Sequence, residues 1–297
     1  MLSSPLLLSF ASVFTLVGLT LVLIAAATDN WIEVQVNRRE ILNAFKREPE
    51  LSVRLQQAYG HNILYFSRNY GLLNICFPDT VPQDIGSFVK LTSTCIWIND
   101  FNPPESKKET FKTVEIYRLY AYRAALICYG AGIIIVTLSL ITGVSGCWSR
   151  SKKLIVTTAI LLLIASLAMA LAMACWHYVA YVDRYTLDVE PYYKSWESVL
   201  RITTRHNFGW SYIVSWIGIT FLMFGSSFML WSYFAVKKEE ELALSAKHGA
   251  YMMPPYYDKG SSAMVPYNYN TYAGYGTYPY YNQFNQGGYY GYVTYGR

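Results

Sequence analysis

The sequence predicts an integral membrane protein in which four transmembrane helices carry most of the fold. Four apolar runs contain no Asp, Glu, Lys or Arg, and they cover residues 5–27, 124–146, 154–175 and 210–235. Each has the roughly 20 residues that a helix needs to cross a hydrocarbon core about 30 Å thick, with every backbone hydrogen bond made internally. The chain is 53% hydrophobic and 14% charged, and the charges lie between the runs.

Basic flanks predict the orientation of these spans. The short connection between the second and third runs contains Arg150, Lys152 and Lys153, and the fourth run is followed by Lys237 and Lys238. Short basic segments stay in the cytoplasm, whereas long loops cross the membrane largely regardless of charge. We therefore expect a multi-pass protein of the plasma membrane with cytoplasmic N- and C-termini and outer loops at 28–123 and 180–209.

The first run has a second interpretation. Ala25–Ala27 after an apolar stretch is also typical of a signal-peptide cleavage site. The run is longer than a usual signal core and no basic residue precedes it, which favours an uncleaved span. With or without cleavage, the segment after the fourth run is expected in the cytoplasm.

The runs predict helix packing in lipid rather than transport. Ser166, Ala170 and Ala174 recur at four-residue spacing in the third run, and small residues at this spacing let helices approach closely. The runs hold no ionisable residue of the kind that marks an ion path. Aromatic residues near the outer ends favour an interfacial belt, and they are Trp31, Trp176, Tyr178, Tyr181, Trp210 and Tyr212.

The first outer loop is too long for a simple connector. Residues 37–58 have the spacing of a charged, amphipathic helix interrupted at Pro49. After it, residues 63–66, 88–91 and 94–98 have the β-branched and aromatic content of strands. Of the five cysteines, Cys76 and Cys95 alone lie in this loop, where oxidation is the default.

A Cys76–Cys95 disulfide is therefore predicted, and closing its loop of about 20 residues contributes roughly 3 kcal/mol in the chain-entropy estimate. A metal site is disfavoured because no histidine pair accompanies these cysteines. Cys147, beside the second run, remains open between a reduced thiol and an acylation site.

Several short motifs occur in the order seen in one family. Trp31 follows the first run, Gly71 and Leu72 stand in the block Gly-Leu-Leu-Asn-Ile-Cys, and Cys95 supplies the second cysteine. Arg123 begins an Arg-Ala segment at the second run, and Gly209-Trp210 begins the fourth. With four spans and a long first loop, the chain resembles the claudin, PMP22 and calcium-channel gamma-subunit superfamily over about residues 5–236.

The resemblance implies a four-helix transmembrane bundle with a small extracellular antiparallel sheet, in which Trp31, Gly71, Leu72, Arg123, Gly209 and Trp210 have structural roles. Leu73 departs from the family pattern, because the family has a Trp there that dips toward the membrane surface. The last residues, 294–297, also lack the apolar C-terminus that PDZ domains bind. In this family the second outer loop touches neighbours or partners; a helical extension of the third span is the other expectation for it.

Residues 237–297 are expected to form a disordered cytoplasmic tail separate from the 1–236 domain. From Tyr251 onward the tail holds fourteen of the 28 tyrosines, together with Gly, Asn, Gln and Pro, and such a composition buries too little surface to fold. Pro254, Pro255 and Tyr257 form a PPxY motif, which is typical of ligands for WW domains. In a tail so rich in Tyr and Pro, a chance match remains the alternative.

The sequence predicts neither an enzyme nor a cofactor. It contains no nucleophile-elbow, zincin or phosphate-loop motif, and its four histidines lie in separate segments. The net charge of +5 is spread over several segments, so nucleic acid is not an expected partner. Two functions remain, each with membrane lipid as surroundings and a cytoplasmic adaptor as a further partner. One is an adhesion or junction protein that contacts other claudin-like proteins, and the other is an auxiliary subunit of a channel or receptor.

Overall fold

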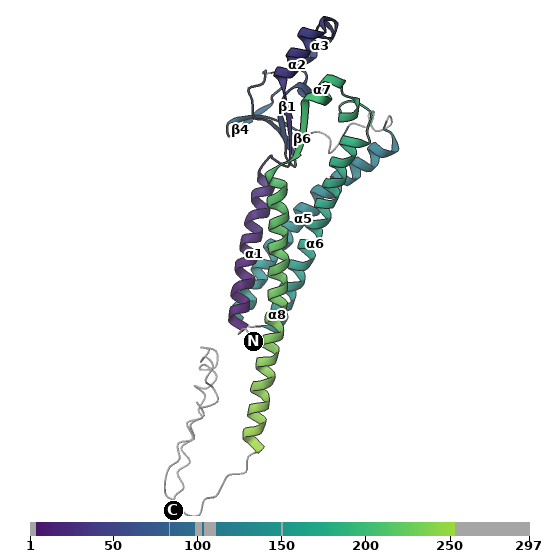
Figure 1. The fold of residues 1–297 in the computed structure, drawn as a ribbon. Coiled ribbons are helices and arrows are strands. Elements are labelled where there is room, and N and C mark those ends of the chain that lie inside the picture. Colours follow the sequence, from purple (N-terminus) through teal and green to yellow (C-terminus); the bar gives the residue numbers. More distant parts are fainter. Residues whose placement is uncertain (1–3, 83, 99–102, 104–110, 150, 253–297) are drawn as a thin grey trace, which may run out of the picture. The chain divides into compact units, whose positions relative to one another are not determined.

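The computed structural model describes residues 4–82, 84–98, 103, 111–149 and 151–252, and it confirms the predicted fold class. It divides into two compact units, 1–245 and 246–297, and the first holds a helix bundle with an antiparallel sheet at one end (Figure 1). The four long helices are α1 (Ser4–Ala27), α5 (Thr113–Ser149), α6 (Lys152–Tyr185) and α8 (Trp210–Met252).

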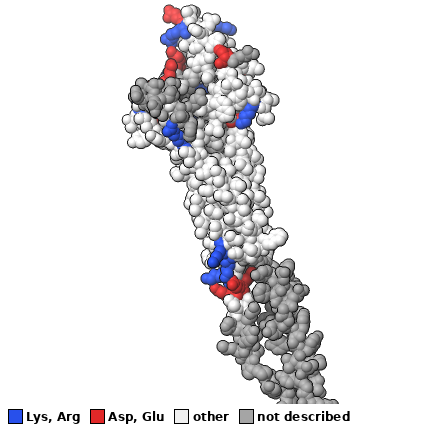
Figure 2. Space-filling model, turned by 180° about the vertical axis from the view of Figure 1, so that it is seen from behind, with Lys and Arg blue, Asp and Glu red and all other residues white. Residues whose placement is uncertain are grey.

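The surface of the bundle is suited to lipid. All four long helices have the length and the hydropathy to span a membrane. Large apolar side chains stay exposed along them, for example Ile127, Ile134 and Ile141 on α5. On the face drawn in Figure 2, a broad band without charged residues separates charges on the sheet end from a charged cluster at the opposite end. The protein is therefore a multi-pass membrane protein.

The helices pack through small residues, and the expected line on α6 is partly buried. A Cβ on Gly132 of α5 would lie 2.6 Å from Cγ of Met169 on α6, so the missing side chain makes room for a large one. Of the small residues expected to pack on α6, Ser166 is buried, Ala170 is half-buried and Ala174 is exposed. The buried line of α6 contains Leu162, Ala165, Ser166, Met169, Ala172, Met173 and Trp176.

Two of the long helices continue beyond the apolar runs at the sheet end. Helix α5 begins at Thr113 and α6 ends at Tyr185, so the expected helical extension of the third span is present. Nε and Nη2 of Arg118 donate to the two carboxylate oxygens of Asp183 at 2.8 and 3.1 Å. This two-bond ion pair fixes α5 to α6 outside the apolar band.

The sheet combines strands from both connections at this end. All neighbours are antiparallel in the order β4-β5-β3-β2-β1-β6. The strands are β1 (Ile32–Val36), β2 (Arg68–Tyr70), β3 (Asn74–Phe77), β4 (Phe88–Lys90), β5 (Ser93–Trp97) and β6 (Thr204–Phe208). Because β6 follows α6 and pairs with β1, the second connection completes the sheet.

The strand predictions are correct for β4 and β5 and wrong for residues 63–66. Ile63–Tyr65 forms a 3-10 turn, η1. The Asn62 side chain accepts a hydrogen bond from the backbone N–H of Leu64 at 3.0 Å, which favours a turn over an extended strand. Local side-chain bonding therefore overrides the β propensity of the apolar run.

The helical part of the first connection packs on the second. Helices α2 (Arg38–Arg47) and α3 (Pro49–His61) are separated at Pro49, as predicted, because Pro begins a helix better than it continues one. Ile41 and Phe45 of α2 share a buried cluster with Trp196, which follows the short turn η3 (Tyr193–Ser195), and with Leu200 of α7 (Ser198–Thr203). The sheet end therefore has a core of its own.

Helix α8 continues past residue 236, where the tail was expected to begin, and ends at Met252. This segment begins with lysines followed by glutamates, and Lys237 Nζ lies 3.8 Å from Glu241 Oε1 one helical turn later. Such pairs, together with Leu and Ala, favour a helix. Residues 253–297, which contain Pro254, Pro255 and Tyr257, lie outside the described residues.

Replacing Trp196 with Ala tests the core of the sheet end. Losing this buried ring should destabilise the packing of α2 on α7 by about 3–5 kcal/mol. Hydrogen exchange of the full chain in lipid nanodiscs should show faster exchange in both helices and unchanged exchange in the spans. Ile202→Ala is the matched control, since Ile202 is 83% exposed on α7 and its loss should leave exchange unchanged. Equal effects of the two variants would contradict this assignment.

Candidate functional site: the junction between the sheet and the bundle

Most of the motif residues gather where α1 leads into β1, around Trp31. The side chain of Trp31 is 1% exposed, and its Nε1–H donates to the carbonyl of Ala25 in the last turn of α1 at 2.8 Å. Its ring makes edge contacts with Tyr129 and Trp176, with centroids 5.5 and 5.4 Å away. The ring therefore fills the space between the ends of α1, α5 and α6.

The backbone of Trp31 belongs to the sheet. Its N–H donates to the Tyr70 carbonyl at 2.8 Å, and its carbonyl accepts from the Gly209 N–H at 2.9 Å. The interfacial-belt interpretation is therefore wrong for Trp31 and Trp176, because both rings are buried between helix ends. Trp210, Tyr178 and Tyr181 are exposed.

Two glycines permit the close approach of the chain around Trp31. A Cβ on Gly209 would lie 1.9 Å from Oδ1 and 2.1 Å from the backbone oxygen of Asn30. A Cβ on Gly71 would lie 2.5 Å from Oδ1 and 2.9 Å from Cα of Asp29. Since backbone atoms stand in the way, only glycine fits at either position without moving the chain.

The remaining motif residues surround this contact. Leu72 is buried, and its carbonyl accepts a 2.7 Å hydrogen bond from the hydroxyl of Tyr122 on α5. Arg123 follows Tyr122 and is half-buried. Trp210 begins α8 with an exposed side chain, so Gly209, rather than Trp210, makes the close contact of this pair.

The predicted disulfide is confirmed, and it lies beside this junction. Cys76 of β3 and Cys95 of β5 are directly opposed in the sheet and are bonded to one another. On the same side, Asp29 forms an ion pair with Lys90, whose Nζ also donates to the Ala27 carbonyl at 2.9 Å. A cation at the last carbonyl of α1 complements the negative end of the helix dipole.

A second polar centre, formed by Arg68 and His206, lies beside the ring of Trp196. The guanidinium of Arg68 is buried and donates to the carbonyls of Ile63, Leu64 and Phe66 at 3.1–3.2 Å. Burial, followed by the charges of Arg68 and Arg184, lowers the pKa of His206 to about 4. His206 is therefore held neutral, with its ring 5.4 Å from the Trp196 ring.

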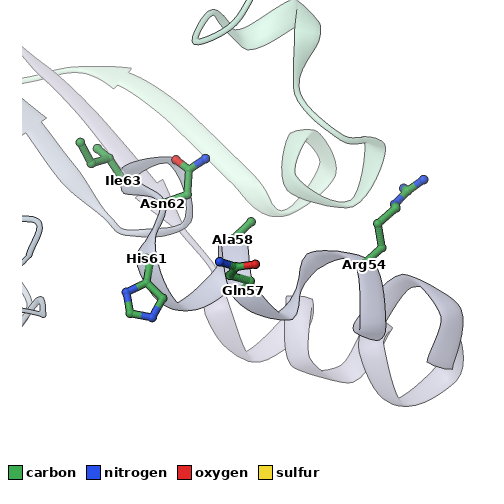
Figure 3. Close-up of a pocket in the computed structure, with 6 residues that line it drawn as sticks. All are labelled: Arg54, Gln57, Ala58, His61, Asn62 and Ile63. Atoms are coloured by element: carbon green, nitrogen blue, oxygen red, sulfur yellow. The ribbon is translucent and has the colours of Figure 1, made fainter.

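The side chains around the depression on α3 do not converge on one point. A shallow depression along α3 is lined by Arg54, Gln57, Ala58, His61, Asn62 and Ile63, and Figure 3 shows Arg54 and His61 pointing away from each other. His61 instead contacts Asp84 at 2.7 Å. Among the described residues, no group of three or more His, Cys, Asp or Glu side chains is arranged to hold a metal ion.

These features define a class: a four-helix membrane protein with a disulfide-closed antiparallel sheet fixed to one end of its bundle. A family model described as PMP-22/EMP/MP20/Claudin tight junction matches residues 16–231. The chain belongs to this family, and the resemblance found in its motifs is confirmed. A comparison with curated proteins returns no match.

The sequence did not predict the residues that connect the motif residues at this junction. Asn30 accepts the backbone N–H of Ser211 through its carbonyl at 3.1 Å, and the hydroxyls of Thr28 and Ser211 lie 2.9 Å apart. Thr28 and Asn30 carry no distinctive pattern in a single sequence. Their placement follows only from the approach of α8 to the end of α1.

Gly209→Ala should disrupt the junction. The added methyl collides with the backbone of Asn30, and overpacking of this kind typically costs about 1–3 kcal/mol. Thermal unfolding in detergent should show a lower midpoint and a lower yield of folded protein. Gly60→Ala is the control, because a Cβ on Gly60 meets no atom within 4 Å and Ala favours helix α3. An unchanged midpoint for Gly209→Ala would refute the steric requirement.

Acid should weaken the sheet end through His206. The pKa of His206 is about 4 in the folded protein against the ordinary histidine value of 6.5, so the unfolded chain takes up the proton first. The free energy of unfolding should therefore fall as the pH drops from about 6.5 to about 4, by up to roughly 3 kcal/mol, and this contribution is fully retained above that window.

Hydrogen exchange of β6 in nanodiscs, compared between neutral and mildly acidic buffer, measures this effect. His206→Phe keeps a ring against Trp196 and should remove the acid sensitivity of β6. His61→Gln, which changes an exposed histidine, should retain it. Acid sensitivity that persists in His206→Phe would assign the effect to another group.

Proposed function

We propose that this protein organises assemblies of membrane proteins at cell contacts. The sheet end stands on the outer side of the plasma membrane and supplies the contact surface for claudin-like neighbours. The basic flanks Arg150–Lys153 and Lys237-Lys238 support this orientation. The chain belongs to a family whose description names the tight junction, and this supports a function at cell contacts.

The observation that carries the proposal is the separate core of the sheet end. Helices α2 and α3 from the first connection pack on α7 from the second, and Arg54 on α3 pairs with Glu197 at the start of α7 at 3.1 Å. Val53 and Ile202 are 82% and 83% exposed on these helices. A packed platform with exposed aliphatic side chains is suited to contacting a protein surface.

A role as auxiliary subunit of a channel or receptor is the second candidate, and one observation in the spans favours it. A Cβ on Gly130 of α5 would meet no atom within 4 Å, and Ile127 and Ile134 are exposed one turn on either side. An uncovered glycine in a span lets another membrane helix approach closely. The Gly209-Trp210 motif is shared with the gamma-type branch of the superfamily that the sequence resembles.

We also propose that the segment after α8 attaches the protein to an intracellular partner. The PPxY motif at Pro254, Pro255 and Tyr257 would bind a WW-domain adaptor. Such an adaptor would link assemblies in the membrane to cytoplasmic proteins. Loss of the interaction in Tyr257→Ala, measured with the full chain and an isolated WW domain, tests this part separately.

Mixed cultures test the leading function. Cells expressing the full chain are grown beside cells that do or do not express it, and its density at shared borders is measured by quantitative imaging. We expect enrichment only where both neighbours express the protein. Val53→Asp combined with Ile202→Asp should abolish enrichment while surface amounts stay equal, because the charges disrupt an aliphatic contact. Gln56→Glu, at an exposed position of α3, is the control.

Proximity labelling from the sheet end in native tissue separates the two candidates. Recovery of adhesion proteins and claudin-like proteins supports the junction function. Stoichiometric recovery of channel or receptor subunits, with border density indifferent to the neighbouring cell, would overturn it in favour of the auxiliary subunit.

A further inference from the structure

One face of the sheet is turned toward the end of α1. Residues directly opposed in antiparallel strands share a face, and the pairs Asn74–Trp97, Cys76–Cys95 and Phe88–Cys95 therefore place Phe88 and Trp97 with the disulfide. Lys90, two residues after Phe88, lies on this face too. We call these residues of β3, β4 and β5 the α1-facing face.

Hydrogen bonds fix the direction of this face. Lys90 Nζ reaches the carbonyl of Ala27, the last residue of α1, and Asn74 Nδ2 lies 3.5 Å from Asp29 Oδ1. The opposite face carries Phe77, which packs with Phe66 and Ile85 in a buried cluster. The sheet therefore covers the opposite face around Phe77 with its own chain and turns the other face toward the end of α1.

The α1-facing face keeps large apolar side chains exposed. Trp97 is 59% exposed, and its ring lies 5.0 Å from the ring of half-buried Phe88. Leu91, in the turn after Lys90, is 96% exposed. In Figure 1 the β4 edge projects on the α1 side of the bundle.

The backbone of Leu91 gives an independent indication. Lys90 pairs with Ser93, which leaves Leu91 and Thr92 as a two-residue hairpin turn, and Leu91 has a φ of 56°. Left-handed backbone in such turns usually belongs to Gly, Asn or Asp, and a leucine there is strained. In water, a strained and fully exposed leucine gains nothing from its side chain, whereas an apolar environment would stabilise it.

We propose that Phe88, Trp97 and Leu91 insert into the interfacial region of the bilayer on the sheet side, so that the β4–β5 hairpin rests on the lipid. Lys90 sets the depth of this insertion, because its side chain reaches from β4 to the carbonyl of Ala27, the last residue of α1. Trp97 extends from the same face with a side chain of similar length. Trp is the residue most typical of this interface.

The end of α1 that this face approaches also exposes apolar side chains. Leu23 and Ile24 in the last turns of α1 are exposed, and the Asp29–Lys90 ion pair lies at the end of this helix.

Fluorine NMR of the full chain, labelled with 5-fluorotryptophan and placed as one copy per nanodisc, tests this inference without any protein partner. Trp97→Phe assigns the Trp97 resonance, and lipids with a nitroxide high on the acyl chain are then added. We expect the Trp97 signal to be lost, as for exposed Trp210 at the start of α8. The signal of Trp196, buried in the core of the sheet end, should persist.

Phe88→Trp adds a second reporter on the same face, and its signal should be lost with the nitroxide as well. Persistence of both the Trp97 and the new signal, at the level of Trp196, would overturn the inference. Loss that occurs only in discs holding two copies would also overturn it, because the face would then contact a second copy instead of lipid. Neither outcome bears on border enrichment, so the inference and the proposed function can fail separately.

Discussion

The rest of the structure depends on Trp31, which joins the transmembrane helix bundle to the antiparallel sheet. A helix bundle in lipid and a sheet in water follow different rules, and a loose connection would let them move independently. The ring of Trp31 is packed among helix ends, its Nε1–H closes the last turn of α1, and its backbone is paired on both sides within the sheet. One residue thus satisfies the helix end, the aromatic core and the first strand, and Gly71 and Gly209 leave it the necessary room.

The sheet end needs its own core because it extends beyond the bundle. Its centre is a buried cation: Arg68 donates hydrogen bonds to turn carbonyls and, at 2.9 Å, to the Tyr70 hydroxyl, and the Trp196 ring lies 5.3 Å away. A buried guanidinium keeps its donors satisfied or is strongly destabilising. The same charge helps to keep His206 neutral, so the stability of this end is linked to pH although no exposed group is involved.

Sequence features predicted those parts of the structure that depend on local composition. The spans follow from uncharged runs, the α2–α3 break from Pro49, and the disulfide from the two cysteines of one loop. The alternation of Ile32, Val34 and Val36 could also have indicated β1. Strand β6, with the polar sequence Thr-Arg-His-Asn-Phe, carries no such signal, because its conformation comes from pairing with β1. The buried positions of Trp31 and Trp176 likewise depend on how helix ends converge.

The position of β6 in the chain has a consequence for biosynthesis. Strand β1 emerges directly after the first span, but its partner β6 is made only just before the last one. Until then β1 has an open edge, and open edges of sheets invite pairing with other chains. A chain that ends before residue 204 keeps that edge permanently, and its Trp31 carbonyl never receives the Gly209 N–H. The sheet is therefore complete only when the chain has been made as far as Phe208, directly before its last span.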